Sequence, residues 1–247
     1  AIGSERYTPY AQTRQPAELL TIANHILGTG QLSLAKFLFI TAEEQGHLSA
    51  HHIQEYLHYV LSRINLTRDV HFYTRTTIDT LDYSGESLNS GSKVVFAANG
   101  EQRRELGHEL PACLRDLSAQ CILPGVAAIP MQAFQHYAET EREMQHLSKQ
   151  LSGHLNELQG FPFLILCDDP VFTAASLNNF LWVTFTRCNP SHDLHGVEAF
   201  TEFKHWGCRG PLLFDARIKP HHAPALQKDA EVEKRVDGIL ERAGYAG

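Results

Sequence analysis

The chain of 247 residues repeats its own pattern at a nearly constant spacing. Residues 37–41 form an apolar run that is followed by Glu43 and Glu44, and residues 163–167 form a second run, followed by two aspartates, at an offset of 126 (163 − 37). Short continuous apolar runs of this kind are typical of strands buried on both faces, as in parallel sheets covered by helices. Both runs are therefore predicted to be central strands.

Each predicted strand is followed by an amphipathic segment whose apolar residues recur at helical spacing. The two segments correspond at an offset of 124 (177 − 53), with these positions on the apolar face: Ile53, Tyr56, Leu57, Val60 and Leu61; Leu177, Phe180, Leu181, Thr184 and Phe185. Ser49 and Thr173, again 124 apart, are predicted to cap the two helices.

The segments that leave these helices also match, since residues 62–69 and 186–193 share the order of an arginine, an asparagine and a final aspartate. An arginine in the last turn suits the carbonyl end of a helix, and a following aspartate can accept its guanidinium. We therefore expect structural ion pairs, with Arg63 binding Asp69 or the carbonyl end of its helix and Arg187 doing the same with Asp193.

Strands alternating with helices indicate an α/β fold with a mainly parallel sheet flanked by helices. We predict two related α/β units, residues 1–118 and 119–228, and a C-terminal helix within 229–247. Further elements are expected at these places: helices at 16–27 and 133–158, strands at 94–98, 122–129 and 212–216, and a helix begun by Asp229.

Bulk properties exclude several functions. The formal charge of −7 and the absence of a Lys/Arg cluster argue against nucleic-acid binding. No apolar run is long enough for a membrane span, and the five scattered cysteines suit free thiols in a cytoplasmic protein. Because the sequence opens at Ala1, we expect it to be part of a longer chain.

Residues 163–169 and 182–193, with the Trp-Val-Thr-Phe-Thr-Arg-Cys-Asn-Pro stretch, resemble the C-terminal domain of UbiD-type decarboxylases. The first half follows the same family order through residues 36–44, 63–69, 77–83 and 91–93, and the tail from Lys228 resembles the family's closing helix. The family's flavin-binding domain and its catalytic glutamate–arginine–glutamate set are not recognisable in this sequence. No catalytic residue is therefore carried over.

The resemblance implies a parent enzyme that decarboxylates an aromatic or α,β-unsaturated acid, such as a polyprenyl-4-hydroxybenzoate, using prenylated FMN with Mn²⁺ and K⁺. This chain would supply the oligomer-forming and pocket-closing part, inactive alone and without a bound cofactor. Its partners would be the missing flavin-binding region and further copies of the protein. Within the loop of residues 76–90, Ile78, Leu81 and Tyr83 are the candidates for facing the substrate pocket.

Two other classes of function stay open: a stand-alone α/β ligand-binding or interaction module, and a small cysteine or zinc hydrolase. His205 and Cys208, near His192, His195 and Cys188, have ligand types that suit zinc, although no metal site is predicted. Cys167 is the candidate nucleophile, because it ends a predicted parallel strand, where α/β folds place their ligands.

Overall fold

A computed structural model describes residues 1–3, 10, 15–42, 47–224 and 229–244; the predicted acidic pair Glu43 and Glu44, and Lys228, fall outside these ranges. The helices and strands follow one another in this order: β1 (Ile2–Gly3), η1 (Pro16–Glu18), α1 (Leu19–Leu27), η2 (Gly30–Leu34), β2 (Phe37–Ala42), α2 (Ile53–Arg63), β3 (Val70–Thr76), β4 (Gly91–Ala98), α3 (Ala112–Arg115), β5 (Gln120–Leu123), β6 (Val126–Pro130), α4 (Tyr137–Ser152), β7 (Phe163–Cys167), α5 (Pro170–Ala174), α6 (Leu177–Arg187), α7 (Pro190–Asp193), β8 (Leu194–Gly196), β9 (Ala199–Glu202), β10 (His205–Cys208), β11 (Leu212–Asp215) and α8 (Ala230–Arg242).

The strands form two main sheets, with orders β1-β2-β4-β3 and β5-β6-β7-β11-β8, and a separate β9–β10 hairpin. β2 pairs in parallel with β1 and β4, and β7 pairs in parallel with β6 and β11. β3 and β8 then close their sheets by antiparallel pairing. The predicted α/β class is confirmed, with parallel pairing at the centre of each sheet.

The two sheets share strand order and strand direction. β1, β2, β4 and β3 occupy the same places as β6, β7, β11 and β8, while β5 adds an antiparallel edge to the second sheet. The registers also correspond, because Phe37 lies opposite Val94 and Phe163 lies opposite Leu212. α2 and α6 keep the offset of 124 (177 − 53) at both of their ends.

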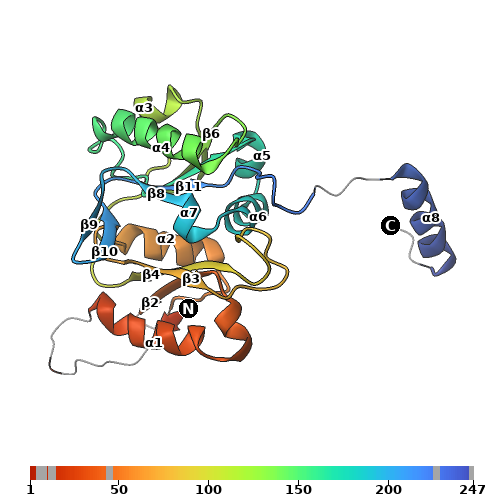
Figure 1. The fold of residues 1–247 in the computed structure, drawn as a ribbon, viewed down its shortest axis with the longest axis horizontal. Coiled ribbons are helices and arrows are strands. Elements are labelled where there is room, and N and C mark those ends of the chain that lie inside the picture. Colours follow the sequence, from red (N-terminus) through yellow and green to blue (C-terminus); the bar gives the residue numbers. More distant parts are fainter. Residues whose placement is uncertain (4–9, 11–14, 43–46, 225–228, 245–247) are drawn as a thin grey trace.

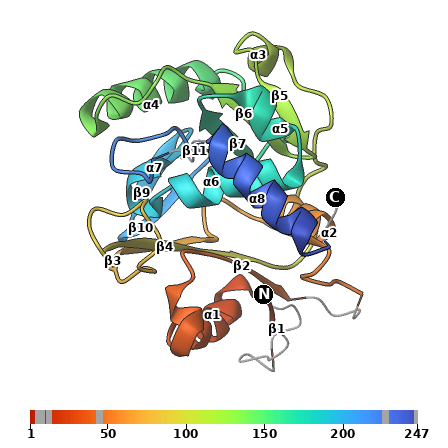
Figure 2. The same cartoon turned by 90° about the vertical axis from the view of Figure 1, so that its right-hand side faces the viewer.

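Helices α2 and α6 lie between the two sheets, whereas α1 covers the outer face of the first and α4 that of the second (Figures 1 and 2). Alternation along the strands explains this layering. In β4, Val94 and Phe96 join the central core cluster, while Val95 faces the α1 side. The same central cluster contains Phe163 and Phe214 of the second sheet, so the two units share one core.

The two predicted helix caps are wrong. α6 is capped by Ser176, whose Oγ accepts a hydrogen bond from the Asn179 amide at 3.1 Å. Thr173 instead lies in the short helix α5, which begins at Pro170 after Asp169. α2 begins after His52, whose side chain makes no capping hydrogen bond. Ser49 precedes His52 in the sequence and is not the N-cap residue of this helix. The true cap positions, His52 and Ser176, keep the offset of 124 (176 − 52).

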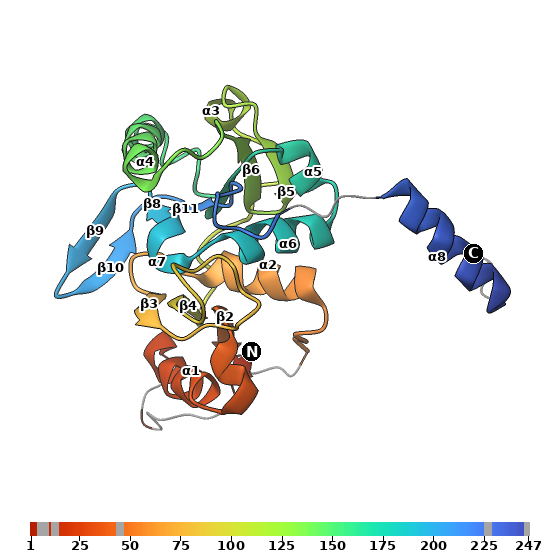
Figure 3. The ribbon, with the colours of Figure 1, turned by 45° about the vertical axis from the view of Figure 1, so that its right-hand side comes forward.

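The long helix is shorter than predicted, since α4 covers only Tyr137–Ser152 and ends at Gly153. The apolar spacing continues to Leu158 through turns rather than through a helix. The final helix α8 begins as predicted, with Asp229 Oδ1 accepting from the amides of Glu231 and Val232. α8 stands away from the body (Figure 3). None of the helices in the described part of the chain is long and apolar enough to cross a bilayer.

Candidate functional site

The loop between β3 and β4 carries the predicted pocket-facing residues, and a buried lysine anchors it. Lys36 Nζ lies 2.7 Å from Asp82 Oδ2 and donates to Ser84 Oγ at 2.6 Å. Ile78 is fully buried, so this side chain anchors the loop in the protein interior. Leu81 and Tyr83 are 78% and 56% exposed, so these two side chains point away from the body.

Local hydrogen bonds give the loop its shape. The Asp79 carboxylate accepts from the Leu81 amide at 2.8 Å, and the Asn89 side chain donates to the Ile78 carbonyl at 2.9 Å. Gly85 permits a close crossing of the chain, because a Cβ there would lie 2.1 Å from the Ser90 carbonyl oxygen. These contacts indicate a fixed turn rather than a loose connection.

The second unit also holds this loop. Glu86 Oε1 lies 2.9 Å from His192 Nε2, and His192 lies on α7. At the base of the loop, Ser92 Oγ donates to Asn189 and accepts from the Ser191 amide. The loop therefore spans the junction between the two units.

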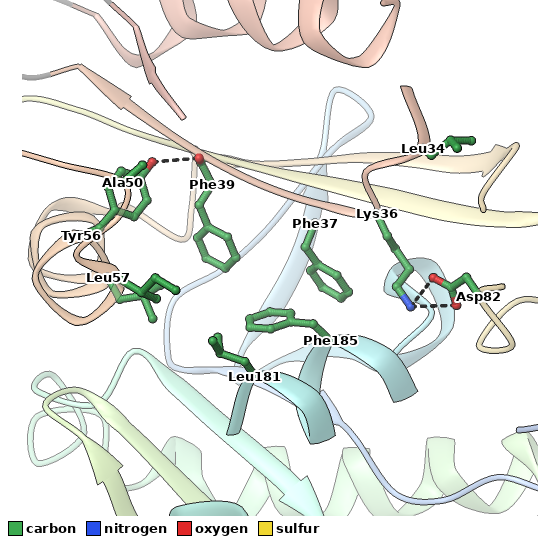
Figure 4. Close-up of a pocket in the computed structure, with 11 residues that line it drawn as sticks. Leu34, Lys36, Phe37, Phe39, Ala50, Tyr56, Leu57, Asp82, Leu181 and Phe185 are labelled. Carbon is green, nitrogen blue, oxygen red and sulfur yellow. Dashed lines mark hydrogen bonds and ion pairs between the residues drawn. The ribbon is translucent and has the colours of Figure 1, made fainter. Parts of the chain in front are cut away.

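Beside Lys36 lies a mainly apolar pocket of about 430 Å³ between β2, α2 and α6. Figure 4 shows Phe37 and Phe39 from β2 turned toward Leu181 and Phe185 from α6. The rings of Phe37 and Phe185 meet edge to face at 4.9 Å. Polar groups lie at one end, where Lys36 meets Asp82.

The residues of this pocket do not fit a flavin mononucleotide. A flavin phosphate needs cations or free backbone amides. The lysine here, Lys36, is already neutralised by Asp82, whose carboxylate would repel a phosphate at the same end. The pocket suits an apolar or aromatic group without a strong charge.

A cluster of fully buried charges lies past the carboxyl end of β11. Arg217 binds both carboxylate oxygens of Asp215, at 2.8 and 2.9 Å, and also Glu143 at 2.8 Å. Lys219 Nζ lies 3.3 Å from Asp193 and donates to the Asp215 carbonyl at 2.9 Å. Every charge in the cluster has an opposite charge beside it, which is typical of a structural network.

Burial sets the protonation behaviour of this region. Burial raises the pKa of Asp193 to about 7, although Lys219 acts against it. Burial also acts to raise the pKa of Asp215, but the hydrogen bonds of Arg217 and the charges of Lys219 and Arg217 outweigh it and leave that pKa lowered. Burial lowers the pKa of His195 to about 4, so this imidazole is neutral near pH 7.

The predicted arginine–aspartate pairs do not form. Arg187 binds Asp168 at 3.2 Å instead of Asp193. Arg63 keeps to its own helix, where it donates to the Tyr59 carbonyl at 3.2 Å, which was the other partner expected for it.

The aspartates instead close their own turns. The Asn65 amide donates to Asp69 at 2.8 Å, and the Asn189 amide donates to Asp193 at 2.6 Å. The repeated motif is thus an asparagine–aspartate turn. The cations beside the two carboxylates are Arg68, 2.6 Å from Asp69, and Lys219, 3.3 Å from Asp193.

The other sequence candidates are separated in the structure. Cys208 Sγ donates to the Gly210 carbonyl at 3.3 Å, while the His205 ring lies against His71 at 5.4 Å. Cys167 is buried and accepts a hydrogen bond from Thr173 at 3.4 Å, and burial raises its pKa. A thiol in that environment is a poor nucleophile.

Sequence reasoning missed Lys36 and the Asp215–Arg217–Lys219 group. A signal for the second was present, because Asp215 interrupts an apolar strand at the place where the first unit has Ala97. A charge at a buried strand position requires a partner. Nothing in the sequence indicated that Lys36 would reach Asp82 across 46 residues.

Residues 2–98, which include β1 to β4, α2 and the anchored loop, match the family model of the 3-octaprenyl-4-hydroxybenzoate carboxy-lyase C-terminal domain. Over residues 2–98, the chain is similar to a UbiD C-terminal domain. The recognition of this family from sequence is confirmed, and the matched domain coincides with the first of the two sheets.

Curated relatives extend the similarity to the second unit. A protein of Chlamydia pneumoniae, named as a subunit of 4-hydroxybenzoate decarboxylase, is 33% identical over 223 residues, which is 89% of this chain and 35% of that protein. An uncharacterized protein of Chlamydia caviae is 32% identical over 89% of this chain and 36% of its own length. The chain thus spans about a third of the relatives that it matches.

Among solved structures, the vanillic acid decarboxylase of Sedimentibacter hydroxybenzoicus in open form is similar with a TM-score of 0.31 and 10% identity. The similarity covers 69% of this chain and 45% of that one, and at this level it supports no further conclusion.

Proposed function

We propose that this UbiD-type chain is the C-terminal, oligomer-forming and pocket-closing part of a cytoplasmic decarboxylase. The whole enzyme would act on an aromatic or α,β-unsaturated acid, such as a polyprenyl-4-hydroxybenzoate, with prenylated FMN, Mn²⁺ and K⁺ held elsewhere in the protein. The observation that carries the proposal is the similarity of 89% of this chain to about a third of a protein named as part of a decarboxylase. The remaining two thirds have room for a flavin-binding region.

We infer further that the second α/β unit is a copy of the first. The shared strand order, the offset of 124 (177 − 53) at both ends of α2 and α6, and the repeated asparagine–aspartate turn support this. A duplication would place one copy against the other through α2 and α6. It would leave the loops of each copy free for a separate role.

The loop of residues 76–90 is the proposed face toward the flavin-binding region. Lys36 holds the loop at Asp82, and His192 holds it at Glu86. Three apolar side chains of the loop are exposed: Leu81, Tyr83 and Leu88. Apolar side chains on a rigid turn are suited to burial against a partner surface, since little conformational entropy is lost on contact. Closure of that surface over a bound acid would exclude water from the reaction.

The test is to replace Leu81 and Tyr83 by aspartate in the longer protein. We expect decarboxylation to fall at least about tenfold while bound flavin is retained, because only the closing contact is lost. Leu32→Asp is the matched control, since Leu32 is also an exposed leucine but lies outside the loop. Unchanged turnover in the loop variant, or equal losses in both variants, would contradict the proposed role.

A further inference from the structure

Three side chains of types that bind transition metals meet on the outer side of the second unit: Cys113, His154 and Glu157. One ligand atom of each lies within 4.8 Å of the other two. His154 Nδ1 and Glu157 Oε1 are 2.9 Å apart. Around a tetrahedral ion, with bonds of about 2.0–2.3 Å, neighbouring ligand atoms are roughly 3–4 Å apart.

Backbone structure holds these residues in place. Glu157 and Leu158 both donate their amides to the His154 carbonyl, so the histidine and the glutamate lie one turn apart on the same side. Leu151 and Leu158 are buried on either side of this turn, and Leu114, beside Cys113, is fully buried in the same core cluster. The site therefore stands on anchored segments, as a metal site requires.

The three side chains differ in their exposure to solvent. Cys113 is buried, His154 is half-buried and Glu157 is exposed. A divalent cation among the three ligand atoms would neutralise the Glu157 carboxylate and bind the Cys113 thiolate.

We propose that Cys113, His154 and Glu157 bind a zinc ion, with a water molecule as the fourth ligand on the exposed side. Thiolate, imidazole and carboxylate are the three ligand types that zinc takes in proteins, and the mixed set disfavours Mg²⁺ and Ca²⁺. Binding exchanges the thiol proton for the metal and releases that proton to solvent. The ion would tie α3 to the turn that follows α4.

This site is distinct from the sequence candidates for zinc, His205 and Cys208, and lies outside the matched domain of residues 2–98. The histidine and glutamate alone have the spacing of an ordinary surface ion pair. Only the fold brings in Cys113, which is 41 residues (154 − 113) from His154 in the sequence.

The experiment loads the whole chain with zinc, removes excess metal by dialysis and measures retained zinc together with the thermal midpoint. The unmodified chain is expected to retain zinc stoichiometrically and to unfold at a higher temperature with zinc than without it. His154→Ala should lose both effects. His146→Ala, which removes an exposed histidine of α4, should keep them.

Cobalt substitution tests the sulfur ligand separately. The Co²⁺ form should show a thiolate-to-metal charge-transfer band that disappears in Cys113→Ser and remains in Cys121→Ser, whose sulfur lies on β5. Retention of zinc by His154→Ala at the level of the unmodified chain would show adventitious binding by surface histidines and overturn the proposal. Absence of the charge-transfer band in the unmodified chain would overturn it as well.

Discussion

Arg217 is the side chain whose removal should cost the most stability at the scale of single residues. Arg217→Met leaves the buried Asp215 without its bidentate partner, so we expect a loss of about 3–5 kcal/mol in the free energy of unfolding. Arg187→Met is the matched control: its ion pair with Asp168 is partly exposed, and its loss should cost about 1 kcal/mol. Urea denaturation measures both. Equal midpoints would show that the buried cluster contributes no more than a surface pair.

His195 should make the free energy of unfolding depend on pH, with lower stability at acidic pH. Its pKa is lowered to about 4 in the folded chain, whereas the unfolded chain takes up the proton near pH 6.5. Stability contributed by the neutral imidazole is therefore complete above pH 6.5 and lost as pH falls toward 4, by up to about 3 kcal/mol.

Asp193 acts in the opposite sense, because its pKa is raised to about 7 and its buried charge costs stability as pH rises from 4 to 7. The measurement is therefore a comparison of denaturation midpoints between pH 7 and pH 4 for the unmodified chain and His195→Gln. The variant should lose less stability on acidification. Parallel pH profiles would contradict the assignment of a neutral buried His195.

At the scale of elements, the two corresponding helices between the sheets, α2 and α6, differ at their N-caps. Ser176→Ala should destabilise α6 by about 1 kcal/mol, because one amide of the first turn loses its acceptor. His52→Ser at the corresponding position of α2 should stabilise by about 0.5 kcal/mol, since His52 makes no side-chain cap. Shifts of the thermal midpoint in opposite directions for the two variants would support the equivalence of positions 52 and 176. A loss of stability in His52→Ser would argue against it.

The strands and helices could be predicted from sequence where local periodicity determines them. The predicted strands and helices are present at the apolar runs 37–41 and 163–167 and at the apolar faces of α2 and α6. The ends of helices are harder to predict from sequence. The apolar spacing continues past Gly153, although helix α4 ends there. Ion pairs were not predictable, because long side chains choose partners by position in space, as Arg187 does with Asp168 and Arg217 with Glu143.

At the scale of the whole molecule, the shared core predicts one cooperative unfolding transition. Phe39, Phe96, Phe163 and Phe214 form a continuous series of ring contacts across the two sheets, at centroid distances such as 5.5 Å between Phe96 and Phe163. Residues 1–118 alone would expose that face, so we expect this half not to fold by itself. Calorimetry of the whole chain should give a single transition. Two separable transitions would show independent units.

We propose that this chain contributes closure and assembly to a UbiD-type decarboxylase, while the catalytic cofactor is held elsewhere in the protein. The most direct measurement incubates the chain with prenylated FMN, Mn²⁺ and K⁺, then follows flavin absorbance after desalting and carbon dioxide release from cinnamic and hydroxybenzoic acids. We expect this chain to retain no flavin and to show no turnover, and the longer protein to retain flavin and to turn over substrate. Stoichiometric flavin retention or turnover above background by the chain alone would contradict it.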